Sequence, residues 1–191
     1  MLRKITRMVI TQAVLLCALS LGLWSQNLLA GRNPDFNNPW PGVPIGTAVS
    51  YTNYCYSGNS AAAWWQIWVN SCSPGEDDIS TVLIPSTLPG STGYMLHVVT
   101  DGDGNGIDES AIASHPNTLS SIWVYINSGC IFIGTGDGGD TGFDEGTCET
   151  GRWFHFSKVP NGISPATEFL VFSFGNGADF YVKDAIIVPA P

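Results

Sequence analysis

Basic residues are scarce in this chain. Only seven of its 191 residues are Lys or Arg, against sixteen Asp or Glu, and three of the seven lie within the first seven positions. Residues 31–191 therefore carry four basic and sixteen acidic side chains, a net charge of −12. Binding to nucleic acid phosphates or to anionic membranes requires clustered Lys and Arg. The composition thus excludes nucleic acid as a partner, and repulsion between acidic loops favours the binding of cations.

Helical patterns are also missing. After Gly31, Gly and Pro recur at short intervals and leave few windows that could hold apolar residues at i, i+3, i+4 and i+7. Short segments rich in Val, Ile and aromatic residues alternate instead with Gly, Asp, Asn, Ser and Pro, which is typical of strands and turns. The predicted strands are Thr47–Tyr56, Ala63–Asn70, Ile79–Ile84, Gly93–Val99, Leu119–Asn127, Gly129–Gly134, Thr150–Phe156, Glu168–Phe174 and Asp179–Val188. This spacing predicts an all-β domain over 31–191, a two-sheet antiparallel sandwich or jelly roll, which begins with a Pro-rich arm at 31–46.

No catalytic motif stands out. The nucleophile motif G-x-S-x-G is absent, and the three histidines are scattered along the chain. Acidic pairs occur, such as Asp108 and Glu109, but they lie in Gly-rich loops that we expect to be open to water. A general acid needs an apolar pocket that raises its pKa. We therefore expect a protein that is not an enzyme.

The first thirty residues have the three parts of a signal peptide. A basic start is followed by the apolar run Met8–Trp24, and Ala30 offers a cleavage position before Gly31. A run of this length could also just span a bilayer. The polar residues Thr11 and Gln12 within the run, and the small residue at its exit, favour cleavage. We therefore predict a signal peptide over 1–30 and a periplasmic or extracellular protein with no membrane insertion after processing.

Four cysteines remain after such processing, which in an exported chain predicts two disulfides. Of the three pairings, we favour Cys55–Cys72 and Cys130–Cys148, because each closes a short loop. Each bond would stabilise the fold by roughly 3 kcal/mol. The lack of a C-x-x-C pair argues against zinc. The segment 136–149, whose ends the last two cysteines would hold together, is predicted to be an acidic loop.

A Gly-rich acidic segment, Asp101–Glu109, is the sharpest local signal. Oxygen ligands at alternate positions, with Gly between them, let a backbone curl around a hard cation, as in the first half of an EF-hand loop. The twelfth position is Ile112 rather than a bidentate Glu, so a loop between two strands that binds Ca²⁺ is the preferred interpretation, and a plain turn is the alternative. The candidate calcium ligands are Asp101, Asp103, Asn105, Asp108 and Glu109.

Aromatic residues crowd the segment 54–68. On a strand, Trp64 and Trp68 point to one face and Trp65 to the other, so one set faces away from the core or lies under a loop. Exposed aromatic rings on a sheet stack against sugar rings. The predicted ligand-binding residues are Trp64, Trp65, Trp68 and Tyr54. The alternative is that all three tryptophans are buried or covered by the arm. Two further tryptophans are expected in the core, Trp123 and Trp153.

Several short motifs follow one another along the chain, and their order is more informative than any single motif. They are Asn33-Pro-Asp-Phe36 with Trp40, Gly93-Tyr-Met-Leu-His-Val-Val99, Asp101–Gly106, Ser120-Ser-Ile-Trp-Val-Tyr125, Thr150-Gly-Arg-Trp-Phe-His-Phe156 and Asp179-Phe-Tyr-Val-Lys-Asp-Ala-Ile-Ile-Val188. This succession resembles the β-jelly-roll carbohydrate-binding modules and the related galactose-binding-like domains of secreted bacterial proteins. The resemblance implies a structural calcium that ties the first strand to the last. Asp184 would be a ligand there, although Asn37 and Lys183 replace two residues of the usual pattern.

Together these features predict a secreted, non-catalytic carbohydrate-binding domain, stabilised by calcium, with a glycan or polysaccharide as its partner. A structural or adhesive subunit of the cell surface or an extracellular assembly, which would self-associate, is the first alternative. A small glycan-active enzyme is the second, and it would require a buried carboxylate pair within a cleft. Aromatic rings exposed in a groove would favour binding, whereas a wide apolar edge would favour assembly.

Overall fold

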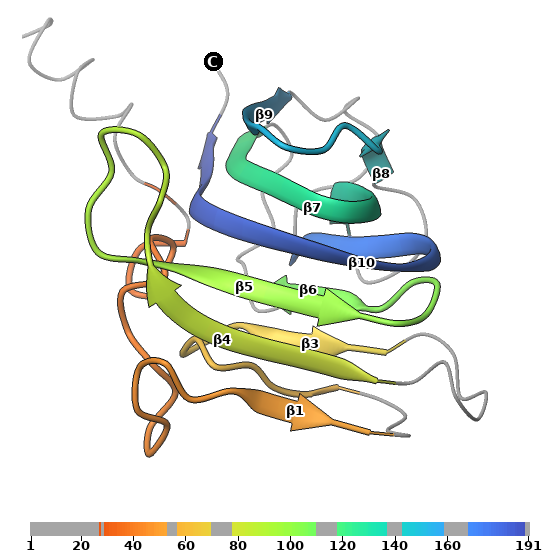
Figure 1. The fold of residues 1–191 in the computed structure, drawn as a ribbon. Coiled ribbons are helices and arrows are strands. Elements are labelled where there is room, and N and C mark those ends of the chain that lie inside the picture. Colours follow the sequence, from red (N-terminus) through yellow and green to blue (C-terminus); the bar gives the residue numbers. More distant parts are fainter. Residues whose placement is uncertain are drawn as a thin grey trace, which may run out of the picture.

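The computed structural model describes residues 27, 29–52, 57–69, 78–109, 118–136, 143–158 and 168–189. Within these ranges the chain forms β-strands and no helix, and hence no helix that could cross a membrane. The strands are β1 (Val49–Tyr51), β2 (Gly58–Asn59), β3 (Gln66–Trp68), β4 (Ile79–Pro85), β5 (Tyr94–Thr100), β6 (Gly106–Glu109), β7 (Thr118–Gly136), β8 (Phe143–Thr147), β9 (Trp153–Lys158) and β10 (Glu168–Pro189) (Figure 1).

Two long strands, β7 and β10, pair along their whole length and run through both sheets of a sandwich. The first sheet has the order β1-β4-β5-β10-β7-β9 and uses the C-terminal half of β10 and the N-terminal half of β7. The second sheet has the order β2-β3-β6-β10-β7-β8 and uses the other halves. All these pairings are antiparallel, so the predicted two-sheet antiparallel sandwich is confirmed.

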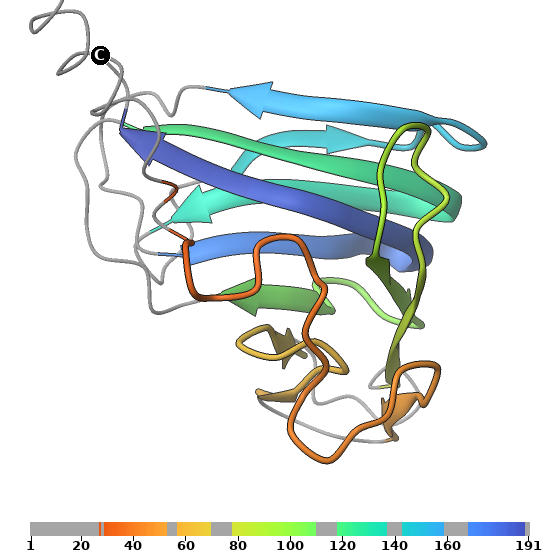
Figure 2. The same ribbon diagram turned by 90° about the vertical axis from the view of Figure 1, so that its left-hand side faces the viewer.

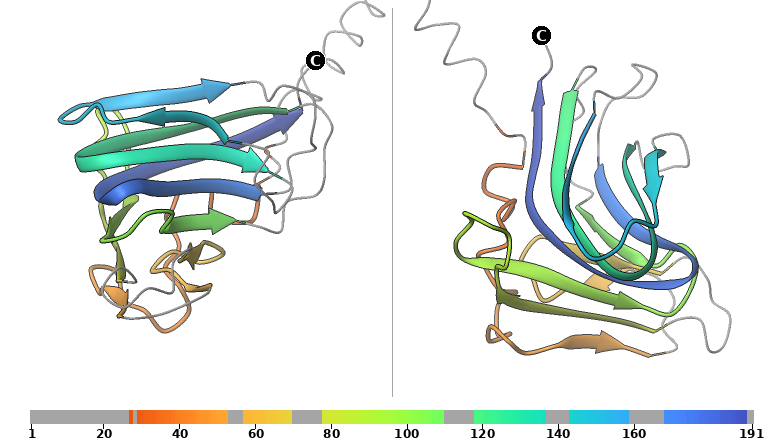
Figure 3. Two further views of the ribbon diagram at one scale, coloured as in Figure 1. Left: turned by 90° about the vertical axis from the view of Figure 1, so that its right-hand side faces the viewer. Right: turned by 45° about the horizontal axis from the view of Figure 1, so that its top comes forward.

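Glycines make the bend at which β7 and β10 pass from one sheet to the other (Figure 3). Gly129, Gly175 and Gly177 have positive φ angles there, and the register of the pairing shifts between Phe174 and Ala178. A Cβ on Gly177 would lie 2.4 Å from the carbonyl oxygen of Thr100. Because only a residue without a side chain fits this backbone approach, the bend depends on glycine at this position.

The core lies between the sheets and receives residues from the N-terminal arm. Alternate side chains of each strand point inward, as in Phe180 and Val182 of β10. Phe36 of the arm is buried against Trp65, with ring centroids 4.7 Å apart. Figure 2 shows the arm, in red to orange, along one side of the sandwich from the end of β10 to β1. The arm is therefore an ordered part of the domain.

A buried lysine joins the arm to the last strand. Lys183 is 1% exposed, and its ammonium donates to the backbone oxygen of Asp35 at 2.6 Å. The same ammonium lies 3.2 Å from the carboxylate of Asp184, which is partly exposed. A buried charge is tolerated only when it is paired and hydrogen-bonded. The contact therefore fixes the arm to β10.

Candidate functional site

Aromatic side chains form a row across the outer face of the first sheet. His97 of β5, Tyr181 of β10, Tyr125 of β7 and Trp153 of β9 occupy directly opposite positions on four neighbouring strands. On the next level along the strands, Trp123 of β7 lies opposite His155 of β9. The Trp and Tyr side chains of this set are half-buried, and His155 is exposed. We call this set of six residues the aromatic face.

The rings of the aromatic face contact one another. His97 stacks on Tyr181 with centroids 4.4 Å apart, and Trp123 stacks on His155 at 4.6 Å. Tyr125 lies between Tyr181 at 5.9 Å and Trp153 at 5.7 Å. Neighbouring strands in a sheet are about 4.8 Å apart, so one ring per strand gives a continuous row. Each ring of the row therefore packs against at least one neighbouring ring.

A polar network crosses the same face beside the rings. Asp179 Oδ1 accepts a hydrogen bond from Asn127 Nδ2 at 3.0 Å and lies 2.7 Å from His97 Nε2. Asn127 Nδ2 also donates to the hydroxyl oxygen of Tyr181 at 3.0 Å. Asp179 and Asn127 are partly or fully exposed, so their remaining oxygen atoms can accept hydrogen bonds from a ligand. The face thus combines flat apolar surface with fixed polar groups.

Strand alternation explains why these residues share a face. Trp123 and Tyr125 are two positions apart on β7, as Trp153 and His155 are on β9 and Asp179 and Tyr181 on β10. The prediction that Trp123 and Trp153 belong to the core is therefore wrong. The core takes their neighbours, such as Ile122 and Val124, instead.

A cleft of about 260 Å³ opens between β8 and β9, at the edge of the aromatic face. Its apolar lining comes from Ile133, Phe154 and Phe156, and its polar lining includes Glu145 and Arg152. His155 lines this cleft and also belongs to the aromatic face. The volume is below that of sites for drug-sized ligands, so the cleft has room for a small polar group such as one sugar unit.

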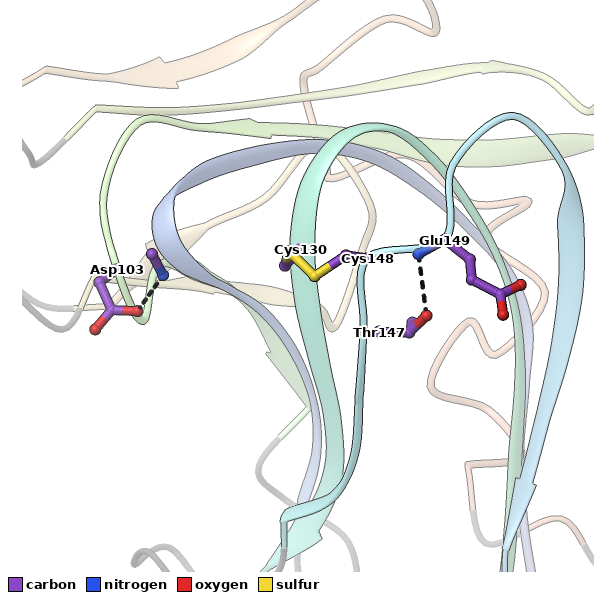
Figure 4. The surroundings of a disulfide bond; sticks show 6 residues. Asp103, Cys130, Thr147, Cys148 and Glu149 are labelled. Carbon is purple, nitrogen blue, oxygen red and sulfur yellow. Dashed lines mark hydrogen bonds between the residues drawn. A yellow bond between two sulfur atoms is a disulfide. The ribbon is translucent and has the colours of Figure 1, made fainter.

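The predicted disulfide Cys130–Cys148 is present and holds one side of the cleft. Figure 4 shows Cys148 between Thr147 and Glu149, both of which line the cleft. The backbone amide of Glu149 donates to Thr147 Oγ1 at 3.2 Å, and its carboxylate pairs with Arg152. The other predicted disulfide, Cys55–Cys72, falls outside the described residues.

The tryptophans predicted to bind a ligand occupy different environments. Trp65 is 0% exposed, packs against Phe36 and Phe169, and donates from Nε1 to the backbone oxygen of Asn33 at 3.2 Å. Because no face of its ring is exposed, Trp65 belongs to the core and not to a ligand-binding surface. Trp64 and Trp68 are 54% and 46% exposed and lie on or beside β3 of the second sheet, away from the aromatic face. Tyr54 falls outside the described residues.

The carboxylates at the start of the Gly-rich segment accept hydrogen bonds from the protein. Asp101 Oδ1 accepts from the amide of Asp78, and Asp103 Oδ1 accepts from the amide of Gly175 at the bend of β10, each at 2.8 Å. Figure 4 shows the Asp103 contact. The loop is thus docked on the bend.

Two of the remaining ligands predicted for this segment, Asp108 and Glu109, lie in β6. Asn105, Asp108 and Glu109 are buried, the last two within β6, so the expectation that this acidic pair is open to water is wrong. Glu109 Oε1 accepts from Arg32 at 2.6 Å. Asp184, the ligand expected at the separate calcium between the first and the last strand, lies beside the Lys183 ammonium. Among the residues that the structure describes, no three His, Cys, Asp or Glu side chains form a metal-binding group. Calcium binding therefore stays a prediction.

Comparisons with known proteins give structural matches only. No family model matches this sequence, and no curated protein does. Among solved structures, the chain is similar to the xylan-binding domain CBM22-1 of Paenibacillus barcinonensis Xyn10C, with a TM-score of 0.47, 14% identity, and coverage of 75% of this chain and 95% of that domain. It is also similar to a carbohydrate-binding module of family 29, with a TM-score of 0.43, 11% identity, and coverage of 75% and 90%. These neighbours belong to the class that the sequence motifs resemble. At such identities and TM-scores, the neighbours carry no information about the ligand of this chain. The ligand must be inferred from the chain's own side chains.

Proposed function

We propose that this protein is an exported, non-catalytic domain that binds a polysaccharide through its aromatic face. The observation that carries the proposal is the row of His97, Tyr181, Tyr125 and Trp153 across four adjacent strands. The axial C–H groups of a sugar ring pack against the electron-rich face of an aromatic ring. Asp179 and Asn127 next to the row would bond hydroxyl groups of the same ligand.

The charge of the domain favours a neutral ligand. Residues 31–191 carry a net charge of −12. Asp179 lies on the face itself, and Glu145 and Glu149 line the adjoining cleft. An anionic polysaccharide would be repelled by this field, and the repulsion would weaken with added salt. Neutral polymers such as xylan, glucans and mannans are therefore the proposed ligand class.

The test is a binding assay with matched aromatic variants. The wild-type domain is incubated with xylan, cellulose, mannan and an anionic pectin, and the bound fraction is measured. Tyr125→Ala and Trp153→Ala should weaken binding to the preferred neutral polymer at least tenfold, because truncation of a contact aromatic typically costs about 1.4 kcal/mol or more. Asn127→Ala should weaken it less. The control Trp68→Ala, which removes an exposed tryptophan from the other sheet, should bind like wild type.

Three other results would contradict the proposal. Loss of binding in Trp68→Ala, with full binding in Trp153→Ala, would place the ligand on the second sheet. Preference for pectin would refute the charge argument. Absence of binding to every polymer at high protein concentration would instead favour a structural or adhesive subunit. Circular dichroism of each variant controls for loss of the fold.

A further inference from the structure

Residues that precede the predicted cleavage position are built into the domain. Leu29 lies N-terminal to Ala30, and its side chain is 0% exposed within the hydrophobic core. Asn27 lies two residues earlier, and its side chain contacts the backbone of β10. Its Oδ1 accepts from the amide of Ile187 at 3.0 Å, and its Nδ2 donates to the carbonyl of Ala185 at 3.3 Å.

Local turns fix this segment further. Asn27 Oδ1 also accepts from the amide of Leu29 at 3.1 Å, and the amide of Ala30 donates to the carbonyl of Asn27 at 2.8 Å. The amide of Arg32 donates to the carbonyl of Leu29 at 2.8 Å, and the Arg32 guanidinium pairs with the buried Glu109. Asn27, Leu29 and Ala30 are thus linked to one another, and Leu29 is linked to Arg32 of the arm.

Cleavage after Ala30 would remove the contacts of Asn27, Leu29 and Ala30 and leave the Arg32–Glu109 pair. The loss of Leu29 would leave a cavity in the core, which is among the costliest changes that a folded domain can undergo. The loss of Asn27 would also leave a backbone donor and a backbone acceptor of β10 without their partner. A mature chain that begins at Gly31 would therefore be a weakened form of this domain.

We infer that export processing cuts the chain on the N-terminal side of Asn27, so that residues 27–30 belong to the mature domain. The upstream sequence offers a suitable position. Ser20 and Gly22 place small residues at the spacing of an A-x-A-like site, and the preceding apolar run Met8–Leu19 is twelve residues long, within the usual 7–15. The peptide bond Gly22–Leu23 is the assigned site. The inference rests on the predicted export signal and is independent of glycan binding.

The direct test is the N-terminus of the exported protein. The full chain is expressed with its own leader in an exporting bacterial host, and the secreted or periplasmic product is analysed by intact mass and by sequencing of its first peptide. A product that begins at Leu23, or at any position up to Asn27, supports the inference. A product that begins at Gly31, or that keeps Met1, overturns it.

A stability measurement tests whether residues 27–30 stabilise the domain. Chains that span 23–191 and 31–191 are compared by thermal melting, and the longer chain should melt at least about 5 °C higher. Leu29→Ala in the longer chain should lower the melting temperature by a similar amount. The matched control Ile45→Ala, which truncates a side chain that is 41% exposed, should leave it nearly unchanged. Equal melting temperatures for both chains and for Leu29→Ala would overturn the inference.

Discussion

The anchor between the arm and the last strand gives the sharpest stability prediction. Lys183 is almost fully buried, and its ammonium donates to Asp35 O at 2.6 Å while it lies 3.2 Å from Asp184 Oδ1. Lys183→Met keeps a long, unbranched apolar stem and removes only the charge and its bonds. Hydrogen bonds to charged groups contribute about 1.5–3 kcal/mol each, and the orphaned carbonyl of Asp35 adds a penalty of its own. Relief from the burial of a charge offsets part of this loss.

We expect a net loss of about 2–3 kcal/mol in the free energy of unfolding for Lys183→Met. In a domain of this size each kcal/mol lowers the melting temperature by about 2–4 °C, so the expected fall is about 4–12 °C. The assay is urea unfolding followed by tryptophan fluorescence, with calorimetry for the melting temperature. Asp184→Asn is the control that removes only the Lys183–Asp184 ion pair. Because the Asp184 carboxylate is 37% exposed, this ion pair should contribute less than about 1 kcal/mol to stability. A Lys183→Met variant as stable as wild type would refute the reasoning. The free-energy cost of burying the ammonium would then equal the stabilisation that its hydrogen bond and ion pair contribute.

Two further predictions follow from the bend of β10 and from the Gly-rich loop beside it. Gly177→Ala should destabilise the domain severely or prevent soluble expression, because its Cβ would meet a backbone oxygen at 2.4 Å, whereas Gly42→Ala, at a similar φ angle with nothing within 4 Å, should cost only about 1 kcal/mol. The melting temperatures of the two variants decide this, and equal effects would refute the steric argument. Calcium binding by Asp101–Glu109 predicts a higher melting temperature in millimolar Ca²⁺ than in a chelator, and Asp103→Asn should abolish the difference. Identical melting curves in both buffers would refute the calcium prediction.

The long strands β7 and β10 show what local sequence patterns can and cannot predict. Apolar runs and their alternation located most strands, including both halves of β7 and of β10. The sequence nevertheless predicted each long strand as two, divided at Ser128 and between Phe174 and Asp179. A Gly-rich hairpin turn and a Gly-rich bend within a strand share the same local signal. Only the pairing of β7 with β10 through the bend distinguishes them.

Two strands arise in segments that were predicted as acidic loops. β6 (Gly106–Glu109) lies within the predicted calcium loop, and β8 (Phe143–Thr147) lies between Cys130 and Cys148. Most of their residues are Gly, Asp or Glu, which are depleted in strands. They become strands because β3 and β10 flank β6 and because β7 pairs with β8. Backbone pairing with partners far away in the chain overrides local preference here.

The amino-acid sequence by itself determined the all-β class, the acidic charge and the Cys130–Cys148 pair, because each depends on residue type or on short spacing. The placement of the aromatic residues was decided only by the tertiary structure. Strands such as β7 are apolar on both faces, so alternation says which residues share a face but not which face turns inward. The packing of the two sheets turned Ile122 and Val124 into the core and left Trp123 and Tyr125 outside. The candidate site is therefore a product of sheet packing, because four separate strands must come together before one row of rings exists.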